Sequence, residues 1–273
     1  MKKRRISPIH FARGYEKLAE RVNKSVRDFL GHPNEENVHA LRAAIRRLEA
    51  SISILPKDAR KEKSLEEYRF RCGRIFKMTS KIRNLDILEN KLAKQKGNEG
   101  VAGMLKRIGQ EREKSVRRSM KAAWKLFEMR IPRVDDKGFG GCGVTLRKVL
   151  HDLDMIIGRE LPLVASDETK VGKLHSLRKH CKKFRYALEL LPQESFKSDA
   201  TELLQSWQDV LGAIRDSDVM IGYLEGLKHP AVRNPLLAAE RVARHRRYLA
   251  FVRSYAEASA GIRLSLVALA GLS

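Results

Sequence analysis

Two short segments of this chain carry a histidine and several basic residues at the same spacing. In order, the matching residues are His39, Leu41, Arg42, Arg46 and Arg47 in the first segment, and His175, Leu177, Arg178, Lys182 and Lys183 in the second. A guanidinium can grip two phosphate oxygens at once, a lysine ammonium acts as a mobile point charge, and an imidazole N–H can donate to the same oxygens. The repeated pattern therefore predicts that two halves of one molecule bind anions through equivalent residues.

In both segments the basic residues lie beside an apolar seam. Apolar residues recur at steps of three and four from Val38 to Leu55 and from Leu174 to Leu191, the spacing of a helix face packed on a core. One residue round from this seam runs the basic row, which in the second copy continues to Arg185. Since a helix advances about 5.4 Å per turn, each row spreads charge over roughly 15 Å and suits an extended polyanion. The competing interpretation is that these long side chains only cover apolar surface with their stems. We favour binding because the same row recurs.

The overall charge of the chain supports an anionic partner. Against 33 acidic residues stand 56 Lys and Arg, giving the 273 residues a formal net charge of +23. Such an excess repels itself in the folded state and indicates a partner such as nucleic acid, polyphosphate or anionic lipid, rather than only a solubilising surface.

Cysteine usage and hydropathy bear on location. Cys72, Cys142 and Cys181 are scattered and form no Cys-x-x-Cys motif, which is typical of a reducing compartment. The basic N-terminus is not followed by an apolar stretch, as a signal peptide would require. The apolar segment from Leu264 to Leu272 is too short to cross a bilayer. We therefore expect a soluble, cytoplasmic protein that does not insert into a membrane.

The periodicity predicts an all-α fold. No stretch shows sustained strand alternation, and Pro and Gly residues punctuate long helical patterns. The expected helices cover residues 13–30, 34–55, 61–94 and 104–129, broken at 96–100, and then 146–160, 167–191, 198–227 and 234–269. The glycine-rich segment 132–143 reads as a joint between a first half, 8–131, and a second half, 144–273. Two packed four-helix bundles within one domain, 1–273, are the simplest architecture.

A second repeated segment supports an internal duplication. Ile82-Arg83-Asn84-Leu85-Asp86 matches Ile214-Arg215-Asp216-Ser217-Asp218. The histidines are 136 residues apart (175 − 39) and the aspartates 132 (218 − 86), so the register slips by four residues, about one helical turn. We expect each arginine to pair with the aspartate three residues on, within its own helix.

Other residues that could do chemistry receive structural interpretations. His175 and His180 lie five apart, on different faces of a helix, and neither repeated histidine has a further ligand at metal-like spacing, so no metal site is expected. Asp216 and Asp218 likewise do not face each other. Trp124 and Trp207 are expected to fill the core.

Together these motifs resemble the CHAD family, named for conserved histidines in an α-helical domain. The resemblance covers most of the chain and rests on both His-x-Leu-Arg segments, on the Phe184 to Leu191 stretch and on the Ile-Arg-x-x-Asp segments. It implies two four-helix bundles related by pseudo-twofold symmetry, and binding of inorganic polyphosphate in a basic central groove or pore, in some members at polyphosphate granules.

The resemblance also implies which residues of this chain contact polyphosphate. The contacts it implies are His39, Arg42, Arg46, His175, Arg178, Lys182 and Arg185, with Arg47, Lys179 and Lys183 as further candidates. Arg74, Lys77 and Lys81 form another row at i, i+3 and i+7 that would widen the basic surface. One departure is Glu49, which occupies the slot matched by Arg185 and would shorten the first row.

Two other functions compete with polyphosphate binding. Nonspecific RNA or DNA binding needs only phosphate contacts, but aromatic residues make up just 6% of the chain and no stacking platform is evident. A phosphohydrolase is disfavoured because no P-loop, His-Glu-x-x-His, Gly-x-Ser-x-Gly or alternating Glu-x-Glu-x-Lys motif occurs. The sequence therefore predicts a non-catalytic binding protein without a cofactor.

Overall fold

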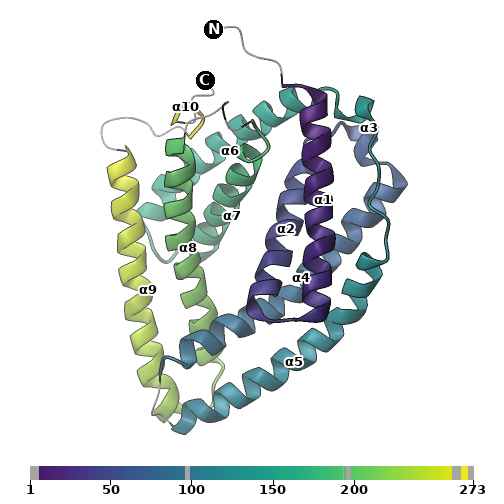
Figure 1. Ribbon diagram of the computed structural model, residues 1–273. Coiled ribbons are helices and arrows are strands. Elements are labelled where there is room, and N and C mark those ends of the chain that lie inside the picture. The colour runs from purple at the N-terminus through teal and green to yellow at the C-terminus, as the bar shows by residue number, and fades with distance from the viewer. Residues whose placement is uncertain (1–5, 96–98, 193, 195–197, 260–265, 270–273) are drawn as a thin grey trace. The chain divides into compact units, whose positions relative to one another are not determined.

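The computed structural model describes residues 6–95, 99–192, 194, 198–259 and 266–269 (Figure 1). Helices account for nearly all of these residues and no strand occurs among them, which confirms the all-α prediction. The chain divides into two compact units, Met1–Leu146 and Arg147–Ser273. The basic residues at 2–5 and residues 96–98 of the expected helix break lie outside the described residues, whereas residues 99 and 100 of that break are helical.

Unit 1 is built around four long helices. They are α1 (Pro8–Gly31), α2 (Glu35–Ser53), α4 (Lys63–Leu92) and α5 (Glu99–Phe127), with the short α3 (Lys57–Arg60) and the 3₁₀ turn η1 (Asp136–Phe139). Along the chain, α1 packs on α2 and α4 on α5, while α2 also contacts α4 and α1 contacts α5. The seam predicted on the first repeated segment is buried here, with Val38, Leu41 and Leu48 at most 1% exposed.

Local sequence signals explain where these helices begin. Ser7 accepts a hydrogen bond from the Ile9 amide at 3.3 Å, and Pro8 occupies a helical position that needs no donor. Asn34 caps α2 by accepting a hydrogen bond from the Asn37 amide at 2.8 Å. Helix α3 was not anticipated, because it is a single turn that begins directly after Pro56.

The glycine-rich segment is a packed turn of unit 1. The Tyr15 hydroxyl donates to the Pro132 carbonyl at 2.9 Å, and the Gly138 amide donates to Oδ1 of Asp135 at 2.8 Å. A Cβ at Gly138 would lie 2.7 Å from Cγ1 of Val134, so this turn needs a glycine. Gly141 adopts a φ of 81°, which favours glycine for a different reason.

Unit 2 repeats the plan of four long helices. They are α6 (Cys142–Ala165, which begins in unit 1), α7 (Val171–Leu188), α8 (Ser198–Glu225) and α9 (Pro230–Ser259), followed by the short α10 (Leu266–Leu269). Helix α8 contacts α7, α9 and α10. Trp207 is fully buried at the centre of this unit, in edge contact with Phe251 and Tyr255, which confirms the prediction for that residue.

The prediction that Trp124 fills the core is wrong. Trp124 lies on α5 with 52% of its surface exposed. The apolar face of α5 is carried instead by smaller residues such as Ala123 and Leu126, both fully buried. Within the described residues, no helix is both long enough and apolar enough to span a bilayer.

Candidate anion-binding rows and the contacts that hold them

The first basic row lies on α2 and leans on α4. Nη1 of Arg42 donates to the Phe76 carbonyl at 2.6 Å, to Ser80 Oγ at 3.0 Å and to Thr79 Oγ1 at 3.2 Å. Thr79 and Ser80 turn their hydroxyls back toward the α4 backbone, donating to the carbonyls of Ile75 and Phe76 respectively. One edge of the Arg42 guanidinium is therefore fixed by the protein.

The Phe76 ring supports two arginines of this row. The guanidinium carbons of Arg42 and Arg46 lie 4.1 and 4.7 Å from the ring centroid. A cation–π contact contributes about 0.5–1 kcal/mol at an exposed site and about 2 kcal/mol when it is desolvated. Phe76 thus keeps two guanidinium groups beside each other in spite of their mutual repulsion. His39, which heads the row, is exposed, and Arg47 is half-buried.

The row expected on α4 is less uniform. Arg74 and Lys77 are exposed, as free contact with an anion requires, but Lys81 forms an ion pair with Glu111 of α5 at 2.8 Å. Glu49 of α2, the acidic departure in the first row, is held by Arg69, whose Nε lies 3.0 Å from each carboxylate oxygen. That pairing offsets the negative charge of Glu49, so Glu49 shortens the first row without reversing its sign.

The second basic row lies on α7. Lys179 and Lys183 are exposed, while Arg178, Lys182 and Arg185 are half-buried. Arg185 also hydrogen-bonds to Gln205 of α8 and lies 3.5 Å from Glu189. The structure therefore places each predicted residue of the repeat on its expected helix, and it adds protein partners for Arg42, Lys81 and Arg185.

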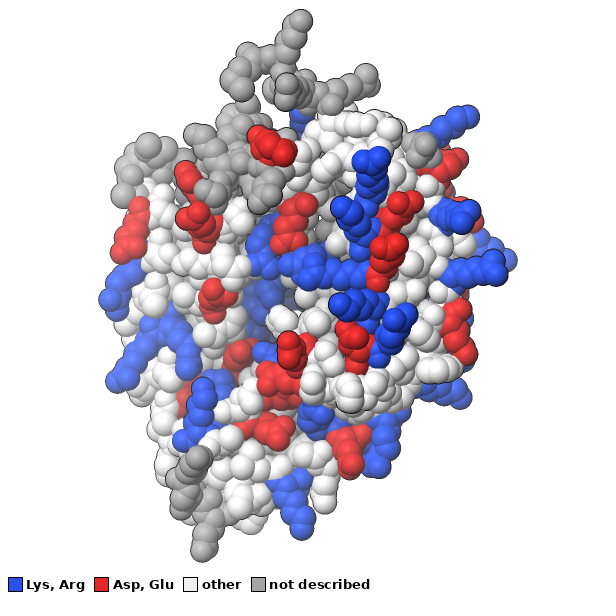
Figure 2. Space-filling model, in the orientation of Figure 1, with Lys and Arg blue, Asp and Glu red and all other residues white. Residues whose placement is uncertain are grey.

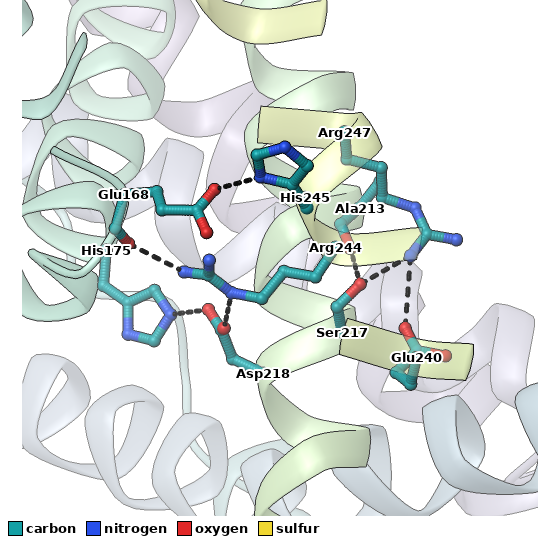
Figure 3. A network of polar contacts seen from close by, with 9 residues as sticks. All are labelled: Glu168, His175, Ala213, Ser217, Asp218, Glu240, Arg244, His245 and Arg247. Carbon is teal, nitrogen blue, oxygen red and sulfur yellow. Dashed lines mark hydrogen bonds and ion pairs between the residues drawn. The ribbon is translucent and has the colours of Figure 1, made fainter. Parts of the chain in front are cut away.

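His175 of α7 is held by a carboxylate of the neighbouring helix α8. Its Nε2 lies 2.7 Å from Oδ2 of Asp218 on α8, and the other carboxylate oxygen of Asp218 accepts from Nε of Arg244 at 2.6 Å (Figure 3). Nη2 of Arg244 in turn donates to the Glu168 carbonyl at 3.3 Å, just before α7. One aspartate thereby connects α7, α8 and α9 and sets the orientation of the imidazole.

Unit 1 contains the same carboxylate–guanidinium contact. Asp86 of α4 accepts from Nε of Arg112 on α5 at 2.7 Å, and Nη2 of Arg112 donates to the Pro33 carbonyl at 2.9 Å, just before α2. In both units the aspartate and the arginine are 26 residues apart. The repeated aspartate segments of the sequence thus each contribute an ion pair that braces the start of a row-bearing helix.

The two aspartates differ in their protonation behaviour. Burial acts to raise the pKa of Asp218, but hydrogen bonds from His175 and Arg244 outweigh burial, so its pKa is lowered. Burial raises the pKa of Asp86, and the hydrogen bond from Arg112 only partly opposes this. Oδ2 of Asp86 is buried with no hydrogen-bond partner among the described residues, whereas both oxygens of Asp218 have one.

Two further histidine–carboxylate pairs lie in unit 2. Glu160 of α6 accepts from Ser176 Oγ at 2.9 Å and lies 2.8 Å from Nδ1 of His180. His245 lies 2.7 Å from Glu168 (Figure 3). No group of three or more His, Cys, Asp or Glu with metal-binding geometry is present in the described part of the chain.

Comparison with known proteins places this arrangement. The model of the CHAD domain family matches residues 10–225, which include both repeated histidine segments and both aspartates. The chain belongs to the CHAD domain family. Polyphosphate binding is the property known for CHAD domains. No curated protein matches the sequence.

Solved structures agree with this CHAD fold. The crystal structure of the CHAD domain from the plant Ricinus communis superposes with a TM-score of 0.66 at 14% identity, covering 90% of each chain. PptA from Streptomyces chartreusis gives a TM-score of 0.56 at 15% identity, covering 91% of this chain and 99% of its own. At these identities the likeness establishes the fold alone.

Two predictions about polar contacts in this CHAD domain are wrong. Arg83 does not pair with Asp86 but with Glu35 in the first turn of α2, and Asp218 accepts from His175 and Arg244 rather than from Arg215. The aspartates turn toward the helix packed beside them because a buried carboxylate needs partners that are shielded from water as well. The expectation that either ring nitrogen of His175 could meet a ligand also needs correction, because Nε2 is engaged by Asp218 and only Nδ1 remains for a ligand.

Three residues that shape the rows were not anticipated from the sequence: Phe76, Arg112 and Arg244. A signal existed for the two arginines, because each follows its repeated aspartate by 26 residues. Phe76 carries no such signal, because nothing in its spacing along α4 indicates which cations of α2 lie over its ring. On the face drawn in Figure 2, Lys and Arg side chains lie among Asp and Glu side chains.

Proposed function

We propose that this CHAD domain binds inorganic polyphosphate without altering it chemically, through the basic rows headed by His39 and His175. The observation that carries the proposal is the recurrence of one row in two units, each braced by the same buried aspartate–arginine pair 26 residues apart. A basic row kept by chance as a solubilising surface needs no such bracing. Membership of a family known to bind polyphosphate supports the choice of ligand.

The rows suit a chain of phosphates in two respects. Successive turns of one helix present charge at intervals of about 5.4 Å, so neighbouring cations meet different phosphates of one extended ligand. In the first row the Phe76 ring holds Arg42 and Arg46 in place before the ligand arrives. Less side-chain entropy is then lost on binding than with unsupported arginines.

The histidine of the second row has a defined part in this proposal. With Nε2 directed at Asp218, the nitrogen that can face a ligand is Nδ1. A neutral imidazole that donates from Nε2 has only an acceptor at Nδ1, so it would repel a phosphate oxygen. His175 therefore contacts a phosphate oxygen only when both of its ring nitrogens carry a proton, one directed at Asp218 and one at the ligand.

The proposal is for binding rather than catalysis. The buried carboxylates of the repeated segments, Asp86 and Asp218, are engaged by arginines. They serve to orient other groups and are poorly placed to activate water. In the cell we propose cytoplasmic polyphosphate, including the granules that contain it, as the partner.

A salt titration tests the choice of ligand against nucleic acid. Affinity is measured for long-chain polyphosphate and for single-stranded RNA of matched charge, from low to physiological salt and beyond. The proposal predicts that polyphosphate binds more tightly at every salt concentration and that the difference persists when long-range attraction is screened. Equal affinities throughout would contradict it, and release of orthophosphate during the titration would identify an enzyme.

A further inference from the structure

One large aromatic side chain of unit 1 is exposed on α5, a helix that carries none of the basic-row residues. Trp124 of α5 is 52% exposed, whereas Trp207, the other tryptophan, is fully buried. Phe127 lies one turn further along α5, half-buried, with its ring centroid 5.9 Å from that of Trp124 and tilted by 44°. Two rings thus form one continuous aromatic surface.

This aromatic surface is bordered by cations from two helices. The guanidinium carbon of Arg27 on α1 lies 5.8 Å from the Phe127 ring centroid. On α5, Lys121 lies one turn before Trp124 and Lys125 directly after it, and both are exposed. We refer to Arg27, Lys121, Trp124, Lys125 and Phe127 as the Trp124 surface.

The indole is oriented without any ligand. Its Nε1 donates to Oε1 of Glu128, one turn along α5, at 2.8 Å. This hydrogen bond uses the acidic group nearest to the ring and satisfies the polar atom of the ring. A held ring loses little freedom when another ring stacks on it.

We propose that the Trp124 surface binds single-stranded nucleic acid by stacking a base on Trp124 while Lys121, Lys125 and Arg27 contact the adjoining phosphates. Exposed aromatic rings beside cations are the general means by which proteins hold single strands without sequence preference. Polyphosphate carries charge but no aromatic ring, so it cannot stack on an exposed indole. The site uses none of the row residues and does not rest on the function proposed for them.

A lipid surface fits the same residues less well. A helix that lies in a membrane interface needs a continuous apolar face on one side. One turn from Trp124 along α5 lie the half-buried Met120 and Phe127 but also the exposed, charged Lys121 and Glu128, so no continuous apolar face runs through Trp124. The aromatic surface is confined to one turn, the size of a base rather than of a bilayer contact.

Substitution of the ring with matched probes tests the proposal. The full chain and its Trp124→Ala variant are titrated with a 12-nucleotide oligo-dT, an abasic strand of the same length, and polyphosphate. We expect Trp124→Ala to weaken oligo-dT binding about 5- to 100-fold, as loss of one stacked base would. The affinities of Trp124→Ala for the abasic strand and for polyphosphate should stay within about twofold of those of the unaltered chain. Trp124→Phe should recover part of the lost oligo-dT affinity.

The control variant is Phe70→Ala, which removes another exposed ring of unit 1, 64% exposed on α4. It should leave oligo-dT affinity unchanged, and circular dichroism should show native helix content for all variants. Unchanged oligo-dT affinity in Trp124→Ala, or an equal loss for the abasic strand, would overturn the proposal. The proposal would also be overturned if the unaltered chain bound oligo-dT and the abasic strand with equal affinity while its binding to phosphatidylserine vesicles depended on Trp124.

Discussion

Nε of Arg244 lies 2.6 Å from Oδ1 of Asp218, and this ion pair decides where His175 points. Both side chains are about nine-tenths buried, and the second oxygen of Asp218 holds the imidazole at 2.7 Å. Arg244 lies on α9, whereas Asp218 lies on α8 and His175 on α7. A contact inside the core of unit 2 thus determines the chemistry offered at the start of its basic row.

Removing the carboxylate of Asp218 should be costly. Asp218→Ala leaves Arg244 buried without its counter-charge, and breaking a buried pair in this way costs about 3–5 kcal/mol. Denaturant unfolding of the variant should show that loss. Asp216→Ala, two residues away with no partner in this network, should change the unfolding free energy by less than about 0.5 kcal/mol. Similar effects of the two variants would show that the Asp218 network does not stabilise unit 2.

The two repeated aspartates should titrate in opposite directions from the ordinary value of 3.8. The folded state lowers the pKa of Asp218, so its contribution to stability is present above pH 3.8 and is lost as the pH falls through the lowered pKa. The folded state raises the pKa of Asp86, so its contribution is largest at low pH and falls as the pH rises from 3.8 through the raised pKa. Carboxyl-carbon NMR should find Asp86 titrating above 3.8 and Asp218 below it. The reverse order would refute this assignment.

Phe76 should matter for binding although it carries no charge. Phe76→Leu keeps an apolar side chain but removes the ring beneath Arg42 and Arg46, and each lost cation–π contact is worth about 0.5–2 kcal/mol. We expect polyphosphate affinity to fall several-fold with only a small drop in melting temperature, and Phe76→Tyr to restore it. Wild-type affinity in Phe76→Leu would mean that the ring does not organise the row.

The part assigned to His175 predicts that its imidazole contributes directly to polyphosphate binding. His175→Gln removes the ring that Asp218 orients, and we expect polyphosphate affinity to fall several-fold, as the loss of one hydrogen bond to a charged group would produce. His151→Gln, which removes an exposed histidine of α6, should leave the affinity as in the unaltered chain. Unchanged affinity in His175→Gln would exclude the imidazole from binding.

Periodicity was enough to predict the long helices, since each buries one apolar stripe. Their ends depend on contacts that periodicity does not contain. Helix α7 starts at Val171 rather than 167 because Asp167 accepts from the backbone amide and hydroxyl of Thr169, which forms a turn. Helix α6 continues through Pro162 to Ala165.

The candidate rows show a similar division. Their place beside the buried seams follows from spacing within one helix, and could be predicted. Which residues hold them depends on the neighbouring helix, as with Arg42 on Phe76 or Asp86 on Arg112. The exposure of Trp124 was missed for the same reason, because spacing along α5 does not show which residues its neighbours cover.

The most direct test of polyphosphate binding by the basic rows reverses charge on the second row and compares it with an equal reversal elsewhere in unit 2. The test variant is Arg178→Glu with Lys182→Glu on α7, and the control is Arg246→Glu with Arg253→Glu, both exposed on α9. Both lower the net charge by the same amount, so a nonspecific field would be weakened equally. We predict that polyphosphate affinity falls by about two orders of magnitude in the test variant, the equivalent of about 2.7 kcal/mol, and only a few-fold in the control. Equal losses in the two folded variants would contradict a site built on the repeated rows.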